Sequence, residues 1–315
     1  MDKKIYNQDP TKDKYVELSR SVAIDATYVQ GGGGNVSLKQ DHVIFVKSSG
    51  TRLIDATASS GFVVMDIDMA RDCISNGEAL DSTVTQLSPP GRPSIEAPLH
   101  IMCAGEYVAH VHSVGAVALG LTANCESVSS GNGWVAVDYV EPGEPLLADL
   151  SANSEFFSSK GSAILKNHGL LIWSSHLDEC IAGVKEVESF CRNYFLDSAS
   201  ERKDFSHMVD SASRETKTID FSGTKSIDWL DFVATHTLVP DQAVFLSDIN
   251  LHERVIGRNV VDASGLSSTQ IEMLQFLKSL GYLIETSKCI SIVKDEDVKG
   301  LLGLESEKYR QGQSK

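Results

Sequence analysis

Residues 107–112 read Tyr-Val-Ala-His-Val-His, and this stretch carries the most information about both the fold and the chemistry of the chain. Its aromatic and β-branched residues predict a strand. Because alternate side chains of a strand lie on one face, His110 and His112 are expected on the same side, with Cα atoms about 7 Å apart. This spacing suits two ligands of one metal ion. A pair of strand histidines satisfied by hydrogen bonds is the alternative.

A third histidine that could complete such a site is His168, in the segment Lys166-Asn167-His168-Gly169. This segment has the composition of a turn between two predicted strands. Catalytic zinc usually has three protein ligands and one open position, and imidazole suits zinc, iron and cobalt alike. The three histidines are therefore candidate ligands of a divalent metal.

Upstream, Glu96 and His100 are four residues apart in a predicted helix that Ser94 would cap. Residues at this spacing share one helical face. A carboxylate beside a metal can act as a fourth ligand, as a general base, or as both in turn. The alternative for Glu96 is a first-turn glutamate that the helix dipole favours.

Two glycine-containing turns could bind an anion. Gly31 to Gly34 precede Asn35, and Ser48-Ser49-Gly50 follow a predicted strand. Backbone N–H groups in such turns can hold a phosphate or a carboxylate. Neither turn matches the GxGxxG or P-loop pattern, which disfavours a Rossmann cofactor or a nucleoside triphosphate.

The order of elements along the chain mixes strands and helices, so the class is α/β or α+β. The expected strands are 42–47, 61–68, 107–112, 162–167 and 170–174, and the expected helices are 13–30, the segment from Ser94 and 176–196.

Residues 198–225 are polar and without periodicity, which predicts a linker. Residues 226–315 form a small C-terminal α+β unit, with helices near 227–236 and 267–281 and strands at 243–247 and 289–293. No catalytic signature is visible in it. The unit covers an edge of the preceding domain, extends an oligomer interface, or closes over the active site and supplies a proton donor, Tyr282 or Tyr309.

The composition restricts the partners. Asp and Glu number 43 against 28 Lys and Arg, so the formal net charge is −15 and nucleic acids and anionic membranes are disfavoured. No apolar run approaches the roughly 20 residues that span a bilayer, and the charged N-terminus does not resemble a secretory signal. We therefore expect a cytoplasmic protein. Its six cysteines are scattered without a CxxC pair, as expected of reduced thiols.

Five motifs taken together resemble the class II aldolase/adducin family, in the order and at the spacings of that family. The resemblance covers about residues 12–197 and implies a metal-binding domain at 1–197. It also implies an αβα sandwich with a central, mainly antiparallel sheet, and a homotetramer. The motifs are GGGGNVSLK (31–39), FVKSSGTRL (45–53), PSIEAPLH (93–100), VAHVH (108–112) and KNHGLLIW (166–173).

The resemblance also assigns roles. It implies His110, His112 and His168 as zinc ligands and Glu96 as the catalytic acid/base. His100, one helical turn from Glu96, is a candidate to orient it. The phosphate-binding positions of the family's sugar-phosphate aldolases are matched by Asn35, Ser49, Gly50 and Ser94.

The sequence departs from the family pattern at two positions. Ile95 replaces a hydroxyl residue that would hold the phosphate, which removes one hydrogen-bond donor of the family's phosphate site. Gly131 stands where the family's fuculose-phosphate aldolases have a tyrosine proton donor, which leaves that donor unassigned.

A closer similarity is to the aldolase-like N-terminal region of bacterial proteins that fuse a rhamnulose-phosphate aldolase to an alcohol dehydrogenase. Residues 134–146 and 236–248 resemble segments of those proteins. The dehydrogenase half, with its GxxxGxG turn and YxxxK pair, is absent from this sequence, so no nicotinamide cofactor is expected.

The resemblance therefore implies a zinc-dependent lyase with a sugar or sugar-phosphate substrate. Retro-aldol cleavage of a ketose or ketose phosphate is the favoured reaction, with the metal stabilising an enediolate and Glu96 moving the proton. The same apparatus permits a decarboxylase, an epimerase or a dehydratase acting on a sugar phosphate or a sugar-derived keto acid. A non-catalytic, adducin-like scaffold is the competing class.

Overall fold

The computed structural model describes residues 10–78, 80, 87, 91–196, 201–202, 205, 217–304, 308 and 311–312. Most of the predicted linker and the proton-donor candidate Tyr309 lie outside these residues. The division into domains at residues 197 and 226 stays a prediction.

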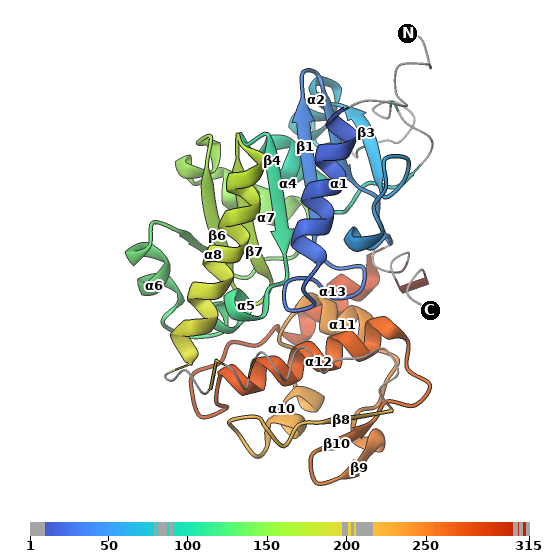
Figure 1. The fold of residues 1–315 in the computed structure, drawn as a ribbon, viewed down its shortest axis with the longest axis vertical. Helices are drawn as coiled ribbons and strands as arrows, with labels where there is room; N and C mark the ends of the chain where they lie inside the picture. The colour runs from blue at the N-terminus through green and yellow to red at the C-terminus, as the bar shows by residue number, and fades with distance from the viewer. Residues whose placement is uncertain are drawn as a thin grey trace.

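A seven-stranded sheet forms the centre of the larger part of the molecule (Figure 1). Its order is β3-β2-β1-β4-β7-β6-β5, and every pair is antiparallel except β5 with β6. The mainly antiparallel sheet that the sequence predicted is confirmed. The strands are β1 (Asn35–Gln40), β2 (Val43–Lys47), β3 (Phe62–Asp66), β4 (Tyr107–Val111), β5 (Val135–Val137), β6 (Gly161–Leu165) and β7 (Gly169–Ser174).

Helices cover both faces of this sheet, which confirms the αβα sandwich. Ala109 and Val111 of β4 belong to the hydrophobic cluster that α1 (Pro10–Ala23), α5 (Val114–Gly120) and α8 (Leu177–Phe195) form on one face. Val108 of the same strand belongs to a second cluster, which contains residues of two helices on the other face, α4 (Ala97–Met102) and α7 (Glu144–Ser151). His110 shares the face of Val108 because side chains alternate along a strand. Two further helices are α2 (Ile67–Ser75) and α6 (Cys125–Gly131).

The C-terminal elements lie beyond one end of the main sheet, in orange and red in Figure 1. Residues of α12 share a hydrophobic cluster with residues of α5, so the core is continuous from the sheet into this unit. The elements are β8 (Thr218–Asp220), α10 (Trp229–Thr235), α11 (Pro240–Leu246), β9 (Val255–Gly257), β10 (Val260–Asp262), α12 (Ser268–Leu283) and α13 (Asp295–Gly303), with β8, β10 and β9 in a small antiparallel sheet. Short 3₁₀ turns occur at Leu53–Asp55, Ser154–Phe157 and His252–Arg254.

Several predicted boundaries and elements were wrong. The predicted helix 13–30 ends at Ala23, because the Asp25 carboxylate accepts hydrogen bonds from the backbone and hydroxyl of Thr27 and closes a turn. Ser94 does not cap a helix, since α4 begins only at Ala97 with Glu96 in the N-cap position.

In the C-terminal unit, the predicted strand 243–247 lies mostly in helix α11, which Pro240 opens at the position where proline is favoured. The predicted strand at 289–293 forms only an isolated bridge between Ile290 and Thr122.

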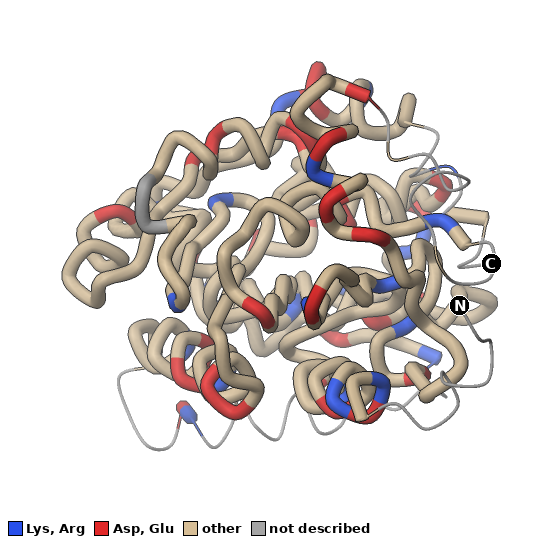
Figure 2. The backbone as a smooth tube through the Cα atoms, turned by 90° about the horizontal axis from the view of Figure 1, so that it is seen from above, with Lys and Arg blue, Asp and Glu red and all other residues tan. Residues whose placement is uncertain are grey.

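Charged residues of both signs are spread over the fold (Figure 2). Lys and Arg positions are interspersed with Asp and Glu along the backbone instead of forming one basic face (Figure 2). Within the described part of the chain, none of the helices combines the length and hydrophobicity needed to cross a bilayer. All six cysteines are described, and each is a free thiol.

Glu188 of α8 is a fully buried carboxylate on the α5 side of the sheet. Its Oε2 accepts hydrogen bonds from the backbone N–H groups of Gly115, at 2.8 Å, and Ala116, at 3.3 Å, where α5 begins. Burial raises the pKa of Glu188 to about 7, although the charge of Arg192 and these hydrogen bonds oppose the shift. The folded chain therefore retains a proton here that the unfolded chain releases near pH 4.5.

We predict that Glu188 makes the protein less stable as pH rises from about 4.5 to 7. A folded-state pKa above the unfolded value contributes stability that is present at low pH and lost once pH passes the folded value. Glu188→Gln cannot ionise and keeps an oxygen for Gly115. The difference between its free energy of unfolding and that of wild type, measured in urea, should increase by about 1–3 kcal/mol in favour of the variant from pH 5 to pH 8. The exposed control Glu186→Gln should show no such trend. A constant difference between Glu188→Gln and wild type would contradict the prediction.

Candidate functional site

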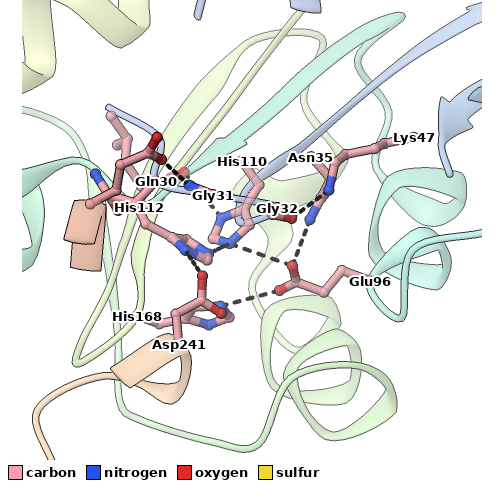
Figure 3. Close-up of polar contacts among 12 residues, drawn as sticks. Gln30, Gly31, Gly32, Asn35, Lys47, Glu96, His110, His112, His168 and Asp241 are labelled. Carbon is pink, nitrogen blue, oxygen red and sulfur yellow. Dashed lines mark hydrogen bonds and ion pairs between the residues drawn. The ribbon is translucent and has the colours of Figure 1, made fainter. Parts of the chain in front are cut away.

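The central strand and one turn bring the three candidate ligands together (Figure 3). β4 presents His110, and His112 follows directly after the strand, with 3.0 Å between their Nε2 atoms. His168 lies in the turn between β6 and β7, after Asn167, whose φ of +57° reverses the chain. One ligand atom from each of the three histidines lies within 4.8 Å of the others, and all three residues are buried.

The hydrogen bonds of the rings direct their lone pairs into the site. His110 donates from Nδ1 to the carbonyl oxygen of Leu170 at 3.2 Å, and His112 donates from Nδ1 to Oδ2 of Asp241 at 2.9 Å. With Nδ1 protonated, a neutral imidazole keeps its lone pair on Nε2. Burial holds the pKa of His110 well below its usual range, so this ring is neutral at pH 7.

This arrangement fits a metal ion. Two facing nitrogen lone pairs repel each other unless a cation lies between them. Two imidazoles on a tetrahedral zinc have nitrogens about 3.3 Å apart, given Zn–N distances of 2.0–2.1 Å, and the observed separation is close to that value. His110, His112 and His168 could therefore hold a divalent metal through Nε2.

Glu96 lies opposite the histidines, at the residue that precedes α4. Its Oε2 accepts a hydrogen bond from Nδ2 of Asn35 at 2.7 Å, and Asn35 pairs with His110 across β1 and β4. Its Oε2 lies 3.5 Å from Nε2 of His110 and its Oε1 lies 3.5 Å from Nε2 of His168. Among the described residues, Oε1 accepts no hydrogen bond. An acceptor in this position could contact a metal or a substrate proton.

Electrostatics keep Glu96 ionised. Burial alone would raise its pKa, but the positive charge that the neighbouring histidines carry when protonated and the hydrogen bond from Asn35 outweigh burial and lower the pKa to about 2. Glu96 is therefore a carboxylate at neutral pH, so it would enter a reaction without a proton of its own.

Backbone hydrogen bonds hold the predicted anion-binding turn at residues 48–50 against the loop at residues 92–94. Ser94 donates its N–H to the carbonyl of Lys47 at 3.0 Å, and Ser49 donates its N–H to the carbonyl of Arg92 at 2.7 Å. The loops enclose a cavity of about 20 Å³, which has room for an ion or a water molecule in this conformation. The predicted site residues that line the cavity are Asn35, Ser49, Gly50, Ser94, Glu96, His112 and His168. His110 does not line it but contacts two residues that do, His112 and Glu96.

Two further residues of the cavity were missed from the sequence. Lys47 is 3% exposed and donates from Nζ to the carbonyl of Gly32 at 2.7 Å. Lys47 lies inside the motif 45–53, and a lysine at the end of a predicted buried strand could have identified it as a candidate site residue. Asp241 comes from α11, 129 residues after His112, and no local pattern connects the two.

His100 and Tyr282 do not line the cavity. His100 is fully buried, its Nδ1 lies 2.9 Å from the hydroxyl of Ser37, and burial lowers its pKa to about 3. The ring of Tyr282 packs against Phe205, with 5.8 Å between ring centroids.

Comparisons with known proteins agree with this architecture. A solved structure described as the N-terminal class II aldolase domain of a conserved Thermoplasma acidophilum protein matches with a TM-score of 0.51 and 21% identity, covering 62% of this chain and 97% of that one. This likeness concerns the fold.

Two curated relatives match in sequence. The uncharacterized oxidoreductase YuxG of Bacillus subtilis is 25% identical over 215 residues, which cover 61% of this chain but only 31% of YuxG. This chain thus spans less than a third of that relative. The L-fuculose phosphate aldolase of Methanocaldococcus jannaschii is 27% identical over 188 residues, or 56% of this chain and 91% of that enzyme.

The family model described as the class II aldolase and adducin N-terminal domain matches residues 13–195, which contain the whole main sheet and all three histidines. Since this match covers more than half of the 315 residues, the chain belongs to the class II aldolase and adducin family.

Proposed function

We propose that this protein is a divalent-metal-dependent lyase that cleaves a carbon–carbon bond of a ketose or ketose phosphate by a retro-aldol reaction. The observation that carries the proposal is the convergence of three buried histidines on one point beside the ionised Glu96. The similarity to an L-fuculose phosphate aldolase supports a sugar-phosphate substrate. Zinc is the metal that three imidazoles and an open position favour.

His110, His112 and His168 would hold the metal. When bound, a divalent metal supplies Lewis-acid stabilisation for negative charge that develops on substrate oxygens. Glu96 is the acid/base. As a carboxylate it takes the proton of the substrate hydroxyl β to the carbonyl, and the oxygen of that hydroxyl forms a new C=O bond as the C–C bond breaks. The electron pair of the broken bond moves toward the original carbonyl, and Glu96 returns the proton to the resulting carbanion. The proton count of the cycle is therefore balanced.

The anionic end of a substrate would lie against the two loops. Asn35, Ser49 and Ser94 line the cavity there, and Lys47 brings a positive charge. Ile95 lacks the hydroxyl of the family pattern. We assign to Lys47 the attraction for a phosphate that Ile95 does not provide, since a hydrogen bond to a charged group is stronger than one between neutral groups.

Decarboxylation, epimerisation and dehydration need the same stabilised carbanion, so they are the alternative reactions for this site. A non-catalytic scaffold has no need for lone pairs that converge in a buried cavity, and we disfavour it. The homotetramer and the cytoplasmic location stay predictions.

Metal content tests the centre directly. Protein purified without a histidine tag should contain about one zinc per chain by plasma mass spectrometry, because three imidazoles suffice for a tight catalytic site. His110→Ala and His112→Ala should lose the metal and retain the far-UV circular dichroism of wild type, whereas the control His42→Ala, at an exposed loop histidine, should keep it. Wild-type protein that is metal-free and takes up no added zinc would refute the proposal.

Glu96→Gln tests the proton transfer. The amide retains the shape of the side chain but cannot accept the proton, so turnover should fall about 10²- to 10⁴-fold. The metal content should stay at the wild-type value. Carbonyl products released from a panel of ketose phosphates and β-keto acids provide the assay, and the responding substrate identifies the reaction. Full activity of Glu96→Gln would exclude this mechanism.

Lys47→Met tests the anion site. Loss of a charge-assisted contact should raise KM for a phosphorylated ketose about 10- to 100-fold, with a smaller change in kcat. The unphosphorylated ketose should be unaffected. Ile95→Ser, which restores a hydroxyl, should lower KM for the phosphorylated substrate. Equal effects of Lys47→Met on both substrates would show that Lys47 does not contact the phosphate.

A further inference from the structure

Asp241 brings a buried negative charge from the C-terminal unit into the histidine cluster. It lies near the start of α11 and is 2% exposed. Its Oδ2 accepts the hydrogen bond from Nδ1 of His112 at 2.9 Å (Figure 3). A carboxylate withdrawn from water in this way is costly unless it is well paired. The segment that carries it lies outside residues 13–195, which match the family model.

The glycine turn closes tightly over this hydrogen bond. A Cβ atom built on Gly33 would lie 2.4 Å from Oδ2 of Asp241 and 2.9 Å from Nδ1 of His112. Both distances are too short for a side chain, so only glycine fits. The absence of a side chain at Gly33 thus allows the backbone to shield the pair from solvent.

Other contacts hold the C-terminal unit on the loops that carry the site. Glu272 of α12 accepts a hydrogen bond from the N–H of Gly31 at 2.6 Å and pairs with Arg52 at 2.8 Å. In the 166–168 turn, Asn167 donates from Nδ2 to the carbonyl oxygens of Leu238 and Ser291, both at 3.0 Å. These contacts hold the C-terminal unit against both the glycine turn and the 166–168 turn.

We propose that Asp241 is a positioning residue of the metal centre, and that the C-terminal unit completes the centre through it. The proposal rests on the proposed metal-binding function of the three histidines. Asp241 holds His112 in the Nδ1–H tautomer and directs its Nε2 lone pair toward the point where the three histidines converge. A carboxylate–histidine–metal arrangement of this kind typically changes metal affinity about 10- to 100-fold.

Zinc affinity measured against a competing chromophoric chelator tests the role of Asp241. Asp241→Ala should bind zinc about 10- to 100-fold more weakly than wild type. Asp241→Asn retains an oxygen for Nδ1 but loses the charge, so its affinity should lie between the two. The cobalt-substituted proteins provide a spectroscopic readout, because a reoriented His112 should shift the visible d–d bands of Asp241→Ala. If Asp241→Ala fails to fold, the zinc affinity of Asp241→Asn becomes the test. An affinity equal to that of wild type then overturns the proposal.

Glu272→Gln is the matched control. It weakens another contact between the C-terminal unit and the glycine turn, but Glu272 touches no histidine of the cluster. Its Tm should fall while its zinc affinity stays within about twofold of wild type.

Three results overturn the proposal in distinguishable ways. Wild-type protein that binds no divalent metal refutes the proposed function and with it the role of Asp241. Tight wild-type binding with an unchanged affinity and cobalt spectrum in Asp241→Ala refutes the positioning role alone. Equal loss of zinc affinity in Asp241→Ala and Glu272→Gln shows a purely structural contact.

Discussion

The register of β4 is the constraint on which the site depends. β4 is hydrogen-bonded on both edges, to β1 and to β7, and this pairing places Asn35 opposite His110. Its Ala109 and Val111 are buried in one hydrophobic cluster and its Val108 in another. A shift of the β4 register by one residue would exchange the two faces of the strand and place His110 on the face now occupied by Ala109 and Val111. The burial of ordinary apolar residues thus fixes where the imidazoles point.

Local patterns in the sequence predicted five of the seven strands of the main sheet and the side chains of the cluster, but they missed β1 and β5. The alternation around His110, the turn at His168 and the position of Glu96 each depend on a few neighbouring residues, and the structure brings these three side chains together. The helix-capping prediction for Ser94 was wrong because the loop pairs with β2 through its backbone instead. Hydrogen bonds of this kind leave no trace in composition.

The C-terminal unit was harder to predict for two physical reasons. By periodicity, the apolar run 243–246 fits a buried strand and a buried helix equally well. Pro240 favours the helix, but only when it is recognised as the first residue of that helix. Asp241 matters through a contact across 129 residues. A single sequence carries no signal for such a pairing, whereas a buried carboxylate is conspicuous in the structure.

The separation of Asp241 from His112 also sets an order of events during synthesis. All three histidines and Glu96 leave the ribosome before residue 241 does, and α12, which holds the glycine turn through Glu272, follows later still. Contacts so distant along the chain form late, after local structure is in place. The nascent sheet therefore presents an incompletely supported histidine cluster. A metal ion bound at this cluster, as proposed above, would be fully supported only after α11 and α12 have folded against the sheet.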